Sequence, residues 1–185
     1  MDPINTIKKN INRRTSIVNE NITFYKDVPL PKWIELSLID VCNRTCSFCP
    51  KSDPTLAPDT YQKMSRILID KLVSDLELIG YDGHIVLCGY GEPLLHKDIF
   101  YITKQLSKVS AVEIVTNGDV LKSELLNKLY KSNVNKVLIS MYDGPEQKQL
   151  FNEIIRSSDV PKSFVILRDR WYDAEKDFGV KLTNR

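Results

Sequence analysis

The sequence predicts an α/β fold built on a parallel sheet. Short apolar runs alternate with amphipathic stretches five times along the chain, as in strands joined by helical crossovers. Glycine and polar residues gather after the expected strands, where parallel folds place their ligands. A length of 185 residues, with 42% hydrophobic and 27% charged residues, suits a single globular domain with a substantial core.

The elements follow in a regular order. Residues 33–39 alternate like a strand and lead directly into a loop that contains cysteine. A helix is expected over 64–79, because its apolar residues recur at helical spacing and Gly80 can cap its end. The same reasoning places further strands at 85–88, 112–115, 137–141 and 164–167, and further helices at 98–108, around 125–129 and around 150–154.

The chain divides into an N-terminal extension (1–30), a core (31–170) and a C-terminal tail (171–185). Lys8, Lys9, Arg13 and Arg14 make the extension basic, but no aromatic residue is interleaved with them, so we expect a solvated flexible arm and no nucleic-acid binding. The net charge of +2 is also too small to indicate a nucleic-acid partner. The sequence shows neither an apolar run of about 20 residues nor a secretory signal, which predicts a cytoplasmic protein without a membrane partner.

Cys42, Cys46 and Cys49 are the most informative motif. A 4Fe-4S cluster normally takes four cysteines, so three closely spaced thiolates would leave one iron open to a substrate. Structural zinc is a weaker interpretation, since it requires four ligands and the chain has no second CxxC pair. A disulfide framework is weaker still, because Cys88, the remaining cysteine, lies in an apolar run. Three buried cysteines without chemistry are the last alternative.

A second candidate segment follows the strand at 85–88. Gly89 and Gly91 allow the backbone to pass close to a ligand, and Glu92 brings a carboxylate that can pair with an ammonium group. Pro93 completes a Gly-Glu-Pro sequence that is equally compatible with a simple turn.

Three later strand ends carry polar residues as well. Thr116 and Asn117 can offer a hydroxyl and an amide to a sugar, although an Asn-Gly turn with Gly118 is the simpler explanation. Ser140 to Gly144 follows the fourth strand. Arg168 follows the fifth, where it either pairs with a carboxylate or faces solvent.

The cysteine loop resembles that of the radical S-adenosylmethionine (SAM) superfamily, which has the same spacing and an aromatic residue, here Phe48, before the last cysteine. The resemblance implies a 4Fe-4S cluster on the three cysteines, with its fourth iron chelated by the amino and carboxylate groups of SAM. It also implies that Glu92 belongs to the Gly-Gly-Glu-Pro motif that binds the SAM amino group, although Tyr90 replaces the first glycine.

The other strand ends resemble this family too. Thr116 and Asn117 match a Thr-Asn-Gly that lies near the SAM ribose. Ser140 and Asp143 fall in a segment similar to Ser-x-Asp-Gly, one residue longer. The carboxylate that Arg168 could pair with is that of the SAM methionine.

The resemblance, which covers about residues 33–168, implies a partial (β/α) barrel of about five to six parallel strands with outer helices. It implies an oxidoreductase-type radical SAM enzyme that cleaves SAM reductively and abstracts hydrogen from an unknown small molecule or peptide, with an electron donor such as flavodoxin or ferredoxin. The tail is similar to the Asn-Arg stretch that leads to the second domain of SPASM-type members, but the sixth strand and the substrate cap are not evident. We therefore expect an unusually short or truncated member. A non-catalytic iron-sulfur or SAM-binding module and a zinc-binding interaction domain are the alternatives.

Overall fold

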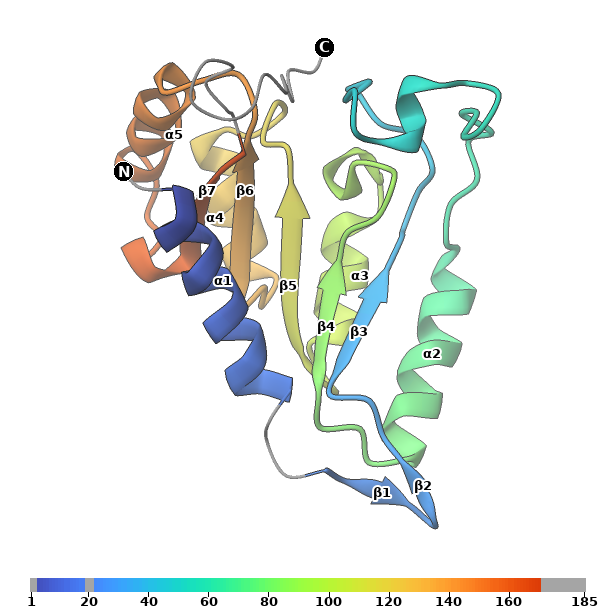
Figure 1. The fold of residues 1–185 in the computed structure, drawn as a ribbon. Coiled ribbons are helices and arrows are strands. Elements are labelled where there is room, and N and C mark those ends of the chain that lie inside the picture. The colour runs from blue at the N-terminus through green and yellow to red at the C-terminus, as the bar shows by residue number, and fades with distance from the viewer. Residues whose placement is uncertain (1–2, 19–21, 171–185) are drawn as a thin grey trace.

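The computed structural model describes residues 3–18 and 22–170, with side chains from residue 11 onward. Five parallel strands form one sheet in the order β3-β4-β5-β6-β7, so that each strand pairs with the next one along the chain (Figure 1). The strands are β3 (Trp33–Leu36), β4 (His84–Leu87), β5 (Ala111–Thr116), β6 (Lys136–Met141) and β7 (Val165–Asp169). The predicted α/β fold with about five to six parallel strands is confirmed. The predicted tail, 171–185, lies outside the described residues.

A helix follows each of the first four strands of this sheet, as predicted. These helices are α2 (Arg66–Leu78), α3 (Ile99–Leu106), α4 (Ser123–Lys131) and α5 (Glu146–Arg156). A small antiparallel hairpin of β1 (Phe24–Tyr25) and β2 (Val28–Pro29), which the sequence reasoning missed, precedes β3.

The main core lies between the outer face of the sheet and these helices. Because side chains alternate along a strand, Ile85 and Leu87 of β4 point to the same face as Ile114 of β5, and all three are fully buried. Ile102 of α3 and Leu129 of α4 belong to the same buried cluster. Burying each such side chain contributes about 1.5–3 kcal/mol, which fixes the strand ends where the site is built.

The first helix, α1 (Pro3–Val18), packs on the opposite, inner face of the sheet, in front of the strands in Figure 1. Arg13 Nη1 lies 2.6 Å from both carboxylate oxygens of Glu113, a buried residue of β5. Arg14 Nη2 lies 3.1 Å from Glu35 Oε1, and both guanidinium groups lie over the Trp33 ring. The expectation of a solvated arm is therefore wrong for Arg13, which binds a buried carboxylate on the inner face of the sheet, whereas Arg14 remains exposed. The side chains of residues 8 and 9 lie outside the described part.

In the described part of the chain, none of the helices combines the length and the apolar character that a bilayer crossing requires.

Candidate cofactor-binding site

A cavity of about 130 Å³ lies at the carboxyl ends of the parallel strands and brings together most of the predicted residues. Ten predicted residues line it: Cys42, Cys46, Phe48, Cys49, Gly89, Gly91, Glu92, Thr116, Asn117 and Ser140. They come from four segments, each of which lies at or just after the carboxyl end of a different strand from β3 to β6. Pro93, Asp143 and Arg168, also predicted, do not line this cavity.

The three loop cysteines are all free thiols and face this common space. The Cys49 backbone N–H donates to the Cys46 carbonyl at 2.8 Å, which closes a tight turn between two of them. Burial raises the pKa of Cys42, and it raises that of Cys46 to about 11. A neighbouring cation is therefore needed to hold these groups as thiolates at neutral pH. Among the described residues, no three His, Cys, Asp or Glu side chains are grouped so as to hold a metal ion.

Cys88 lines the same cavity from the end of β4. Burial, together with the nearby Glu35 carboxylate, raises the pKa of its thiol to about 12. Its place beside the cysteine loop, outside the motif, makes it a natural control for the three loop cysteines.

Glu92 joins the segments that follow β4 and β5. Its Oε1 accepts hydrogen bonds from Thr116 Oγ1 at 2.7 Å and from the Leu94 backbone N–H at 3.0 Å, and its Oε2 accepts from the Asn117 backbone N–H at 2.9 Å. Only 3% of the residue is exposed, and burial raises the pKa of its carboxyl group although the hydrogen bonds act in the opposite direction. A carboxylate has about four acceptor positions, so three partners leave about one for a ligand.

The glycines beside Glu92 are needed for contact within the protein. A Cβ at Gly91 would collide with the carbonyl oxygen of Ile39, and one at Gly89 would collide with the Ser37 side chain. Gly89 also has a φ of +134°, which L side chains rarely adopt. The segment after β4 thus packs directly against the end of β3, and Tyr90 between the glycines is 61% exposed.

Asn117 connects the turn after β5 to the cysteine loop. Its Nδ2 donates to Asn43 Oδ1 at 2.8 Å and lies 3.9 Å from Cys42 Sγ, and its Oδ1 accepts from the Asp119 backbone N–H at 2.9 Å. The Thr116 hydroxyl that bonds to Glu92 also accepts from the Gly118 backbone N–H at 3.0 Å. These contacts form the predicted Asn-Gly turn and at the same time orient it toward the cysteines.

Arg168 is half-buried, and its guanidinium group is directed toward the neighbouring strand β6. Its Nη2 donates to Ser140 Oγ at 2.9 Å, and Ser140 is buried. Burial lowers the pKa of Arg168 to about 10. Its buried Nε has no hydrogen-bond partner within the part of the chain that the structure describes.

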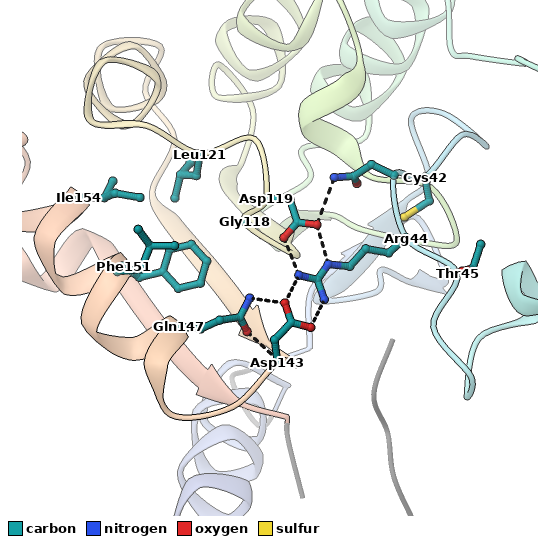
Figure 2. A pocket seen from close by; sticks show the side chains of 12 residues that line it. Cys42, Arg44, Thr45, Gly118, Asp119, Leu121, Asp143, Gln147, Phe151 and Ile154 are labelled. Atoms are coloured by element: carbon teal, nitrogen blue, oxygen red, sulfur yellow. Dashed lines mark hydrogen bonds and ion pairs between the residues drawn. The ribbon is translucent and has the colours of Figure 1, made fainter. Parts of the chain in front are cut away.

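Three residues of the site were missed by the sequence reasoning: Tyr142, Arg44 and Asp119. Tyr142 lines the cavity, and its ring centroid lies 5.5 Å from that of Phe48. Arg44 binds both Asp119 and the predicted Asp143. These three side chains form part of the wall of a second, larger pocket of about 660 Å³ (Figure 2). The sequence contained one signal for Arg44, a basic residue inside a cysteine motif, but nothing local identified its partners 75 and 99 residues away.

Comparison with protein families gives a match over most of the described chain. The model of the Radical SAM superfamily matches residues 36–168, a range that contains every predicted site residue.

Individual relatives agree with this match. An S-adenosyl-L-methionine-dependent 2-deoxy-scyllo-inosamine dehydrogenase from Niallia circulans is 32% identical over 119 residues, which cover 62% of this chain and 46% of that protein. A GTP 3',8-cyclase from Aquifex aeolicus (strain VF5) is 31% identical over 160 residues, which cover 83% of this chain and 47% of the cyclase. The chain thus spans about half the length of these curated relatives.

A solved structure shows the same fold. The crystal structure of BtrN in complex with AdoMet and 2-DOIA matches with a TM-score of 0.67 and 27% sequence identity. The match covers 76% of this chain and 57% of the BtrN chain.

Proposed function

Because the chain belongs to the radical SAM superfamily, we propose that it is an enzyme core that holds a 4Fe-4S cluster on Cys42, Cys46 and Cys49 and binds SAM beside it. One observation carries the proposal: the three cysteines and the Glu92 carboxylate line a single cavity at the carboxyl ends of the parallel strands.

The donor set suits a cluster better than a single ion. A cluster binds each thiolate to a different iron, so its three ligands need not converge on one point. The three loop cysteines line one cavity, and three thiolates are one short of the four ligands that structural zinc takes. When bound, the cluster and SAM supply a 5'-deoxyadenosyl radical that can abstract hydrogen from a substrate.

The chain's own residues orient SAM and exclude water. Glu92 offers its remaining acceptor position to the methionine ammonium group, while Thr116 and Asn117 hold it in place. The neighbouring rings of Phe48 and Tyr142 line the cavity, where they would limit the access of solvent to bound SAM. This division of labour leaves the chemistry to the cofactors and the positioning to the protein.

The substrate is proposed to be a small molecule, since relatives named above act on an inosamine and on GTP. The cycle also needs a one-electron donor, for which a flavodoxin or ferredoxin is suitable. Cysteines kept reduced for metal binding fit the cytoplasm.

Anaerobic reconstitution tests the proposal. The chain should take up about four iron and four sulfide per molecule. Single Cys42→Ala, Cys46→Ala and Cys49→Ala variants should each lose the cluster, whereas the matched control Cys88→Ala, from the same cavity, should keep it. After reduction with dithionite, the loaded protein should convert SAM to methionine and 5'-deoxyadenosine.

Two other results would point elsewhere. Stoichiometric zinc without sulfide, in protein never exposed to air, would contradict the iron-sulfur assignment and favour a zinc-binding domain. Bound cluster and SAM without any 5'-deoxyadenosine would favour a non-catalytic module.

A further inference from the structure

We propose that Arg44 is a positioning residue that fixes the cysteine loop in its cluster-binding arrangement by joining it to the loops after β5 and β6. This inference rests on the proposed function, because it assigns the cysteine loop to a cluster. It concerns a residue that contributes no metal ligand and lies between Cys42 and Cys46.

The Arg44 side chain is fully buried and binds two carboxylates at once (Figure 2). Its Nε and Nη2 donate to Asp119 at 2.7 and 2.5 Å, and its Nη1 and Nη2 donate to Asp143 at 3.0 and 2.7 Å. Each carboxylate therefore receives two N–H groups of a planar fork, the geometry that distinguishes arginine from lysine.

Both aspartates also form hydrogen bonds within their own loops. Asp143 accepts a hydrogen bond from Gln147 Nε2 at 3.0 Å, and Gln147 Oε1 accepts the backbone N–H groups of Tyr142 and Asp143 at 2.7 and 2.9 Å. On the other side, the Asp119 backbone N–H donates to Asn117 Oδ1. The guanidinium thus connects the start of α5, the turn after β5 and the cysteine loop.

The two hollows that flank Arg44 differ in volume and in the residues that line them. On one side lies the 130 Å³ cavity with the three cysteines, and on the other the 660 Å³ pocket, where the apolar residues Leu121 and Phe151 contribute to the wall. Arg44 borders both, as does Cys42. Without the guanidinium, the Asp119 and Asp143 carboxylates would face each other beside the cysteine loop. Their repulsion would push apart this loop and the loops after β5 and β6.

The chain offers a matched control on its surface. Arg66 of α2 also binds a carboxylate through Nε and Nη2, at 2.9 and 2.5 Å from Asp98 Oδ1, and its guanidinium lies over the Tyr101 ring as that of Arg44 lies over Tyr142. Its side chain is 58% exposed and lies on α2, outside the cysteine loop. Arg66→Met should therefore remove a single exposed arginine–carboxylate pair without affecting the cysteine loop.

The test compares Arg44→Met, Arg44→Lys and Arg66→Met with the parent. Hydrogen exchange of the apoprotein should become at least about tenfold faster in peptides spanning 42–50 for Arg44→Met, with the strands unchanged. After reconstitution, loss of iron to a chelator should be about 10- to 100-fold faster, the usual effect of disturbing a group that supports metal ligands. Arg44→Lys, which keeps the charge but not the fork, should recover only part of this loss.

The inference would be overturned if Arg44→Met showed the same hydrogen exchange in residues 42–50 and the same iron retention as the parent and Arg66→Met. If Arg44→Met does not fold, Arg44→Lys and Asp143→Asn carry the same comparison. A parent chain that takes up no cluster would instead refute the proposed function, and this role with it. If the parent and Arg44→Met both take up the cluster and retain iron equally well, the positioning role alone is refuted.

Discussion

Replacing Glu92 should lower both the free energy of unfolding of the apoprotein and its affinity for SAM after reconstitution. The two effects can be measured separately. Two of the three hydrogen-bond partners of Glu92, the Thr116 hydroxyl and the Asn117 backbone N–H, are buried, and each buried donor left unsatisfied costs about 1–3 kcal/mol. Glu92→Ala should therefore lower the free energy of unfolding by about 2–6 kcal/mol. Glu92→Gln keeps an acceptor oxygen for two partners and loses one, so it should cost about 1–3 kcal/mol.

SAM affinity separates the binding role from the structural one. Loss of a hydrogen bond to a charged group costs about 1.5–3 kcal/mol, so reconstituted Glu92→Gln should bind SAM roughly 10- to 150-fold more weakly while retaining iron. Urea unfolding of the apoprotein and calorimetry of the reconstituted protein measure the two effects. Unchanged SAM affinity, with reduced stability, would show that Gly91-Glu92-Pro93 is a structural turn only.

The pH dependence gives an independent check on Glu92. Burial raises the pKa of this carboxyl group, so the folded state holds its proton more tightly than the unfolded state does. The resulting stability is complete below the unfolded value of about 4.5 and is lost as the pH rises through the folded pKa. The parent should therefore lose stability relative to Glu92→Gln as the pH rises above 4.5, and a constant difference would contradict this.

Three further predictions concern stability and the cavity. Burial lowers the pKa of His96, so the parent should lose stability relative to His96→Gln as the pH falls below about 6.5, and parallel unfolding curves at pH 5 and 7 would exclude this. Arg13→Ala, which leaves the buried Glu113 unpaired, should cost about 3–5 kcal/mol in urea unfolding. The exposed Arg14→Ala should cost only about 0–1 kcal/mol, and equal effects would show that Arg13 is not a buried anchor. Tyr90→Gly, which restores the usual glycine pair, should leave SAM binding measurable by calorimetry, and abolished binding would assign the ring a direct role.

The sheet was predictable because its signals are local. Alternating and periodic apolar residues located all five strands and the four outer helices, and only the boundaries moved by a few residues. The first strand ends at Leu36 and not at Ile39, since Ile39 leaves the sheet and pairs with Lys63. The helix α1 was missed because the partners that hold it, Glu35 and Glu113, lie on strands of the sheet.

The site was predictable only where a short motif carries the chemistry. The cysteines, Glu92 and Asn117 belong to such motifs, and the structure gathers them around one cavity. Arg44 and Asp119 were not found, because a buried ion pair between loops 75 residues apart leaves no pattern in either segment. Gly89 and Gly91 were predicted to let the backbone pass close to a ligand, and the close neighbour that the structure gives them is the segment after β3.

The long separation between Arg13 and its buried partner has a consequence for synthesis. The helix α1 leaves the ribosome before the sheet does, and the carboxylate that anchors it is made 100 residues later. At about 5–20 residues per second, the N-terminal segment would wait roughly 5–20 seconds before β5 could receive it. During that interval its basic residues keep it hydrated, and the sheet can assemble strand by strand from neighbours in the chain. The docking of α1 would then be a late step in folding, in which the helix covers the inner face of the sheet only after the strands beneath it have paired.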